Sequence, residues 1–202
     1  MARRWRHFMD VNSHKKDQLN WRGTKFASLL IILLLAQGCA TVDDRKLNQV
    51  AIDAEIKLDI NKRLFNRKNI DLFLDLQTNV YEGRVMLTGA VKSDFNRRRI
   101  ETLAKGIPGI QVIYNNVQVT NLGGYKNTAN DVWIRAKIRS QLLAENGVKS
   151  ANYQVRVINS TVYLLGRALS NLELRKVLTI AKRVKHVSKV IHHVVVRPTV
   201  KK

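Results

Sequence analysis

The second half of this chain repeats the first. When residues 76–119 are shifted by 77 positions they align with 153–196, and the segments before them align at a shift of 78. The residues that match at corresponding positions are Gln77 and Gln154, Val80 and Val157, Val85 and Val162, Leu87 and Leu164, Gly89 and Gly166, Ser93 and Ser170, Arg98 and Arg175, Ala104 and Ala181, Lys105 and Lys182, Val117 and Val194, and Val119 and Val196. Because each copy of a repeat forms the same supersecondary unit, the sequence predicts two homologous units of about 75 residues.

Each unit has the same order of elements. A helix with an apolar residue at every fourth position comes first. Two alternating apolar strands then flank a tight turn, at Glu82-Gly83 in the first unit and Asn159-Ser160 in the second. A second helix and a Val-rich strand complete the unit. The predicted buried stripes of the first helices are Ile56, Ile60 and Leu64, and Ile134, Ile138 and Leu142. The predicted strands are 71–81, 84–91, 111–120, 153–158, 161–168 and 187–196.

The order αββαβ predicts an α+β fold of two tandem domains, each a three-stranded sheet covered by two helices. Ser93, and Ser170 with Glu173, predict the starts of the second helices, and Thr128 with Asp131 fits a capping box. The second helices should bury Ile100, Leu103, Ala104 and Ile107, and Val177, Ile180, Ala181 and Val184. The expected boundaries are 48–120 for the first domain, 121–127 for a linker, 128–198 for the second domain and 199–202 for a basic tail. The linker is short, so we expect the domains to touch.

An apolar segment precedes the repeats. Eleven residues from Phe26 to Ala36 carry no charge, Arg22 and Lys25 come just before them, and Gly38 and Cys39 come soon after. A basic region, a short apolar core and a small-residue cleavage site are typical of a secretory signal peptide, here residues 1–38. The segment is too short to span a bilayer, which requires about 20 apolar residues. The sequence does not decide between Met1 and Met9 as the start.

Cys39 is the only cysteine of the chain. The run from Leu35 to Cys39 resembles a bacterial lipobox, although Ala36 stands where the usual form has Leu. The resemblance implies cleavage before Cys39, lipid on its sulfur and amine, and residues 39–47 as a lipidated N-terminus and tether. Ala40, rather than Asp, then implies the outer membrane. The alternative is a buried helix with a chance cysteine.

The charge of the chain predicts an anionic partner. The whole chain has a net charge of +21, and without residues 1–38 it has 29 basic and 13 acidic residues, a net of +16. Such an excess favours a polyanion. Behind a signal peptide we expect anionic phospholipid, lipopolysaccharide or an acidic protein, and no nucleic acid. The few aromatic residues form no stacking platform for bases.

Two short motifs connect the repeats to a known family. Val85-Met-Leu-Thr-Gly89 and Val162-Tyr-Leu-Leu-Gly166 each precede a helix and a Val-rich strand. In this they resemble BON domains, bacterial periplasmic and outer-membrane modules. The resemblance covers residues 45–198 and implies phospholipid binding and support of outer-membrane integrity, without catalysis. We interpret Gly89 and Gly166 as structural glycines at a strand end, where the chain turns into the helix.

The first helix of the second unit is the candidate lipid-binding site. Trp133 stands where the first unit has Glu55, and Lys137 stands where it has Asp59. Because Glu55 is expected to face solvent, Trp133 should also lie near the surface. Arg135 and Arg139 flank it, and a Trp edged by cations suits a bilayer interface. The alternatives are that Trp133 packs against the linker or the other domain, or that it binds an envelope protein, which would make the chain an interaction scaffold.

Other candidate sites are weaker. The basic side chains of the second helices fit either a solvated face or a contact with anionic lipid; they are Arg97, Arg98, Arg99, Arg175, Lys176, Lys182, Arg183 and Lys185. His192 and His193 are adjacent on a strand, so they point to opposite faces and predict no metal site. No nucleophile with a base, no paired carboxylates in an apolar setting and no phosphate-binding loop are found. We therefore expect a non-enzymatic protein without a cofactor, lipid-anchored at the periplasmic face of the outer membrane.

Overall fold

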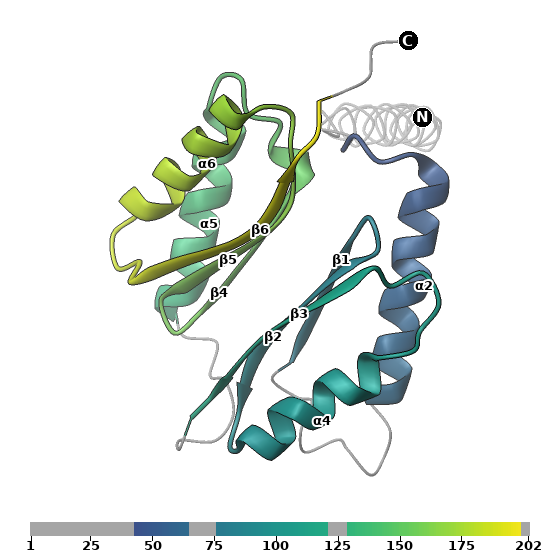
Figure 1. The fold of residues 1–202 in the computed structure, drawn as a ribbon. Coiled ribbons are helices and arrows are strands. Elements are labelled where there is room, and N and C mark those ends of the chain that lie inside the picture. Colours follow the sequence, from purple (N-terminus) through teal and green to yellow (C-terminus); the bar gives the residue numbers. More distant parts are fainter. Residues whose placement is uncertain (1–42, 65–75, 121–128, 199–202) are drawn as a thin grey trace, which may run out of the picture. The chain divides into compact units, whose positions relative to one another are not determined.

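The computed structural model describes residues 43–64, 76–120 and 129–198. They form two domains with the predicted order αββαβ (Figure 1). The first domain contains α2 Leu47–Leu64, β1 Gln77–Tyr81, β2 Arg84–Val91, α4 Asp94–Ala104 and β3 Val112–Val119. The second contains α5 Ala129–Ala144, a short 3-10 helix η1 Ser150–Asn152, β4 Tyr153–Ile158, β5 Thr161–Ala168, α6 Asn171–Arg183 and β6 Lys189–Val196. The α+β prediction is confirmed.

Each domain contains one three-stranded sheet with its hairpin pair antiparallel and its last pair parallel. The strand orders are β1-β2-β3 and β4-β5-β6. The parallel third strand requires a crossover, which α4 and α6 supply. The predicted first-helix stripes are buried in both domains, and the second helices bury Ile100, Ala104, Val177 and Ala181. The structure matches three predicted strands residue for residue, namely 84–91, 153–158 and 161–168. The strand predicted at 71–81 begins at Gln77 in the structure, and residues 71–75 lie outside the described part of the chain.

A buried aspartate of the first helix holds the hairpin turn in each domain. Both residues of each turn have positive φ, the geometry of a type I′ turn. The Asp53 carboxylate accepts hydrogen bonds from the backbone N–H groups of Glu82 (2.7 Å) and Gly83 (2.8 Å). Asp131 accepts in the same way from the turn of the second domain, at 2.8 and 2.9 Å. The capping pattern did not predict this role for Asp131, and Thr128 lies outside the described residues.

The second helices begin at the predicted serines. The Ser93 hydroxyl accepts from the Asn96 N–H, and the Ser170 hydroxyl accepts from the Glu173 N–H. The Glu173 carboxylate is buried and accepts from the N–H groups of Leu169 (2.6 Å) and Lys149 (2.9 Å). Glu173 therefore fastens the segment before β4 to the start of α6.

The predicted position of the two structural glycines was wrong. Gly89 and Gly166 do not end a strand: each lies within its strand, two residues before the last one. Their φ values are 142° and 154°, a region that side chains rarely adopt. A Cβ on Gly166 would lie 2.0 Å from the Asn152 carbonyl oxygen. The glycine is thus required because a neighbouring backbone approaches closely, and not because the chain turns into a helix.

The two sheets contact each other through side chains on the faces opposite the helices. The apolar contact consists of Tyr81, Met86, Ile158, Tyr163 and Leu165, with Tyr114 and Ile191 at its margin. The five central residues are almost fully buried. The prediction that the domains touch is therefore confirmed, and the contact is a third apolar core.

Polar contacts fix the register of this interface. The buried Arg84 guanidinium of the first domain donates to two carbonyl oxygens of the second, those of Gly166 and His193, both at 2.8 Å. The His193 ring stacks on Tyr114 with centroids 3.7 Å apart, and its Nε2 lies 2.7 Å from Asn116 Oδ1. Burial, assisted by the neighbouring His192 and Arg84, lowers the pKa of His193 to about 4.

Gly166→Ala should lower the free energy of unfolding by more than about 1 kcal/mol, because positive-φ strain is joined by a clash with backbone. Gly106→Ala is the matched control: Gly106 also has positive φ (+75°), but a Cβ there would meet no atom within 4 Å. Urea unfolding of the two variants measures the difference. Equal losses would contradict the close approach at Gly166.

Protonation of His193 should weaken the interface. Because its pKa is lower in the folded state than the ordinary 6.5, the full stability is expected above pH 6.5 and should be lost as the pH falls toward 4. His193→Phe keeps a ring over Tyr114 but cannot titrate, so it should flatten this fall. His192→Gln, at an exposed neighbour, should not. Urea unfolding at a series of pH values tests this, and identical profiles for both variants would refute it.

Candidate functional site

The outward face of α5 carries exposed apolar side chains, although the helix already buries an apolar stripe. Ile134, Ile138 and Leu142 point into the core of the second domain. On the other side, Val132 is 39% exposed, Trp133 46% and Leu143 65%. Trp133 and its counterpart Glu55 are both exposed, as the repeat comparison predicted. The helix therefore presents apolar side chains to both the core and the solvent.

Cations border this face on both sides. Arg139 and Lys137 are exposed and Arg135 is half-buried. Because an α-helix has 3.6 residues per turn, Arg135 and Arg139 share one flank, and Trp133 and Lys137 share the other. The two arginines lie near Arg156 on β4. The pKa of Arg156 is lowered mainly by burial and further by the positive charges of Arg135 and Arg139. The structure thus places the four predicted residues on the two flanks of one exposed helix face.

Trp133 contacts a segment that the sequence did not point to. Its ring meets the edge of His186, which follows α6, with centroids 6.2 Å apart at 71°. Lys185 beside it is also exposed. His186 has positive φ (68°), as its position in a tight turn after the helix requires. The exposed surface therefore continues from α5 to residues 185–186. No periodic pattern predicted this, because the contact joins residues that are 53 positions apart.

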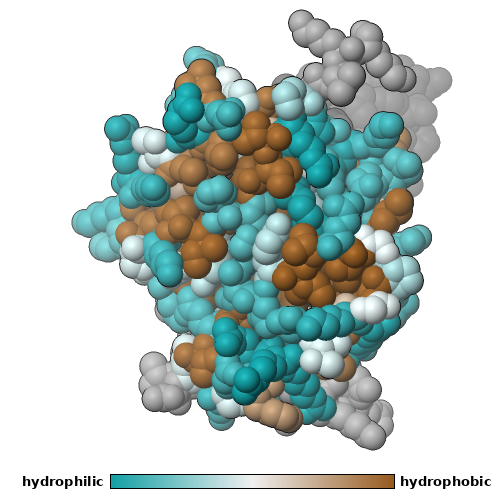
Figure 2. Space-filling view, in the orientation of Figure 1, coloured by the Kyte–Doolittle hydropathy of each residue, from teal (hydrophilic) through white to brown (hydrophobic). Residues whose placement is uncertain are grey.

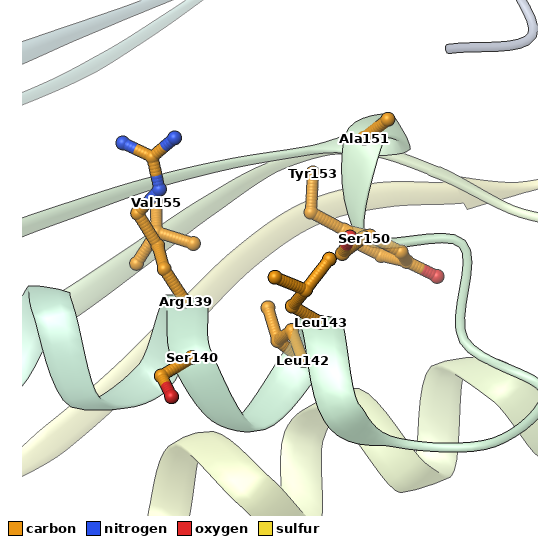
Figure 3. Close-up of a pocket in the computed structure, with 8 residues that line it drawn as sticks. All are labelled: Arg139, Ser140, Leu142, Leu143, Ser150, Ala151, Tyr153 and Val155. Carbon is orange, nitrogen blue, oxygen red and sulfur yellow. The ribbon is translucent and has the colours of Figure 1, made fainter. Parts of the chain in front are cut away.

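A pocket of about 330 Å³ lies beside the C-terminal half of α5. Figure 3 shows Leu142, Leu143 and Tyr153 gathered at one part of the pocket and Arg139 with Val155 at another. The remaining lining residues are Ser140, Ser150 and Ala151. The pocket therefore joins apolar walls to a cation at the same helix that presents Trp133.

Several of the basic side chains of the second helices form ion pairs. Arg97 and Arg98 pair with Asp94 at 2.5 and 3.0 Å, and Lys176 pairs with Glu145 at 2.9 Å. Lys105 pairs with Glu101 at 3.0 Å. These contacts favour the solvated-face interpretation of that surface. Lys182, Arg183 and Lys185 are exposed on the second domain.

Within the described residues, no group of three or more His, Cys, Asp or Glu side chains has the arrangement of a metal site. In the same part of the chain no helix is both long and apolar enough to cross a membrane. Cys39, the predicted lipidation site, lies outside the described residues.

Comparison with known families agrees with the fold. Residues 52–121 and 130–198 each match the BON domain. The chain belongs to the BON-domain family. Both copies of the repeat are therefore BON domains, and together they account for most of the chain.

Three relatives illustrate the range of the family. An uncharacterized protein in the gshII 5' region of Anaplasma centrale is 38% identical over 70% of this chain and 93% of its own length. The outer membrane lipoprotein DolP of Haemophilus influenzae is 29% identical, and a 21 kDa hemolysin of Actinobacillus pleuropneumoniae is 32% identical. Both alignments cover 55% of this chain and 57% of the relative, so the match spans little more than half of these two proteins.

The two BON domains differ in the charge of their first helix. On α5 the only acidic residue is Asp131, which is buried. On α2, Glu55 and Asp59 stand among the outward side chains, and Asp59 pairs with Lys62. Exposed apolar residues alone do not separate the domains, since Leu58 on α2 is also exposed. Figure 2 likewise shows hydrophobic patches among hydrophilic residues over both domains. An exposed apolar face on a helix whose exposed charged residues are all basic distinguishes the second BON domain.

Proposed function

We propose that this BON-domain protein is a lipoprotein at the periplasmic face of the outer membrane, and that it binds anionic phospholipid through α5 of its second BON domain and so supports outer-membrane integrity. The observation that carries the proposal is the outward face of α5, where Trp133 and Leu143 are exposed between flanking cations. The function proposed is binding rather than catalysis.

The chemistry of a bilayer surface matches this face. Trp prefers the head-group region, where its ring meets apolar chains and its N–H meets water. Each Lys or Arg near an anionic membrane surface contributes about 1 kcal/mol. An amphipathic helix with cations beside an apolar stripe lies in the interface plane and buries its apolar side chains there. Arg135, Lys137 and Arg139 would meet phosphates while Trp133 enters the head-group layer.

The location is supported by the N-terminal sequence and by a relative. Residues 1–38 have the pattern of a signal peptide that ends at a lipobox-like Cys39. A relative of 29% identity is named an outer membrane lipoprotein. Acyl chains contribute about 0.8 kcal/mol per buried methylene, and two or more chains give stable anchoring.

Cys39→Ala should abolish lipid attachment and leave an unprocessed or soluble form, because the acyl chains need the cysteine sulfur and the amine exposed by cleavage. Metabolic labelling with a palmitate analogue, followed by fractionation of the envelope, measures both effects. Equal label on wild type and variant would refute the lipoprotein proposal.

Binding of a soluble form, residues 40–202, to vesicles with anionic phospholipid should depend on α5. Arg135→Glu with Arg139→Glu should weaken binding by well over tenfold, since each cation contributes about 1 kcal/mol and reversal adds repulsion. The loss should be larger at low salt than at high salt. Trp133→Ala should weaken binding with much less salt dependence, because its contribution is apolar. Vesicle sedimentation across a salt series measures these effects.

The matched control lies on α2 of the first BON domain. Lys57→Glu with Lys62→Glu makes the same change of net charge at exposed positions and should affect binding much less. Unfolding midpoints of all variants should stay close to wild type, because the buried stripe of α5 is untouched. Wild-type binding by the Trp133 and arginine variants would contradict the lipid surface and favour an envelope protein as the partner of Trp133.

A further inference from the structure

The segment just after the proposed lipidation site is docked on the folded domains. The sequence suggested a polar tether at 39–47, but residues 43–45 are partly buried and make specific contacts. Asp44 binds the second domain: its N–H donates to Asn152 Oδ1 (2.9 Å), its carboxylate accepts from Asn152 Nδ2 (2.8 Å), and Lys149 Nζ donates to the same carboxylate. These partners are more than 100 residues away in the sequence.

Arg45 binds the first domain. Its Nη1 donates to the buried Asp53 carboxylate at 2.7 Å, and its guanidinium lies over the Tyr81 ring, 4.5 Å from the centroid. Asp43 holds the same guanidinium from the other side at 2.6 Å. Burial lowers the pKa of Arg45, but the hydrogen bonds and charges of Asp43 and Asp53 outweigh it and raise that pKa overall. Three consecutive residues before α2 thus contact both BON domains.

We infer that Asp43, Asp44 and Arg45 form a latch that fixes the orientation of the two BON domains on the lipid anchor. The inference rests on the proposed anchoring at Cys39. Cys39 is only four residues before Asp43, so the chain between them spans at most about 14 Å. An anchor this close, joined to a docked segment, holds one end of the folded unit against the bilayer and prevents free rotation.

The latch determines which surface comes closest to the lipid. Asn152, which binds Asp44, ends η1, and its neighbours Ser150 and Ala151 line the pocket together with Leu143 (Figure 3). Leu143 is among the most exposed large apolar residues of the described chain. Trp133 lies ten residues earlier on α5, about 15 Å further along the helix. The C-terminal end of α5 therefore meets the bilayer first, and Trp133 is reached as the helix lies down on the surface.

The test compares the membrane depth of three labelled positions in the full-length protein purified from membranes. Leu143→Cys, Trp133→Cys and Leu58→Cys are each labelled with a fluorophore, because an acylated Cys39 offers no free thiol. Vesicles of neutral phosphatidylcholine containing a brominated phosphatidylcholine quench labels that approach the bilayer. Neutral lipid removes the electrostatic attraction proposed for α5, and the Asp44 and Arg45 variants separate orientation by residues 43–45 from the apolar contacts of α5 that remain.

Quenching is expected to be greatest at position 143, smaller at 133 and smallest at 58 on α2. Asp44→Ala with Arg45→Ala should abolish the difference between 143 and 58, and Asp44→Asn, which removes only the charge that Lys149 meets, should reduce it. Lys46→Ala, at an exposed neighbour, should leave it unchanged. Unfolding midpoints show that each variant is folded.

Equal quenching at 143 and 58 in the wild type, or an unchanged difference in the double variant, overturns the latch. Either result leaves the palmitate labelling and the binding of residues 40–202 to anionic vesicles standing. Failure of the full-length protein to sediment with neutral vesicles overturns the anchoring and the latch together.

Discussion

The fold depends on one contact, the packing of the two sheets against each other. In each BON domain the helices cover one face of a three-stranded sheet, and the other face would otherwise meet water. Tyr81 and Met86 from the first sheet and Tyr163 and Leu165 from the second bury that face. Buried aromatic rings contribute more apolar area than any other side chains. Because of this contact neither domain has a free sheet face, and the helices, α5 among them, are left as the outer surface.

Arg84 makes the contact specific as well as apolar. A buried cation is costly unless it is hydrogen-bonded, and both terminal nitrogens of the Arg84 guanidinium donate to carbonyl oxygens of the second domain. One of these belongs to Gly166, whose backbone lies against Asn152, and Asn152 binds Asp44. A continuous set of contacts thus runs from the sheet interface through a strand glycine to Asp44, five residues after the proposed lipidation site. Displacing the second domain would leave Arg84 without these acceptors.

Much of the fold could be predicted, because it is local and occurs twice. The positive-φ turns, the serine caps and the stripe of Ile134, Ile138 and Leu142 leave short-range patterns, and the repeat made the exposure of Trp133 predictable from Glu55. Contacts between distant residues leave no such pattern. The turn-binding role of Asp53 and Asp131, the stacking of His193 on Tyr114, the contact of Trp133 with His186 and the docking of Asp44 all join side chains far apart in the sequence. Gly166 was placed at a strand end because the motif shows where a glycine is required but not which backbone approaches it.

The two first helices have diverged in the use of equivalent positions. Asp53 and Asp131 each hold a hairpin turn, but Asp53 also accepts a hydrogen bond from Arg45, so α2 takes part in docking residues 43–45. The outward acidic residues of α2 are not expected to weaken lipid binding, because α2 is not the proposed lipid surface. On α5 an outward acid would repel anionic head groups and weaken the effect of Arg135, Lys137 and Arg139. The repeat supplies two copies of one scaffold, and the charge on the outer face of each first helix distinguishes the first BON domain from the domain proposed to bind lipid.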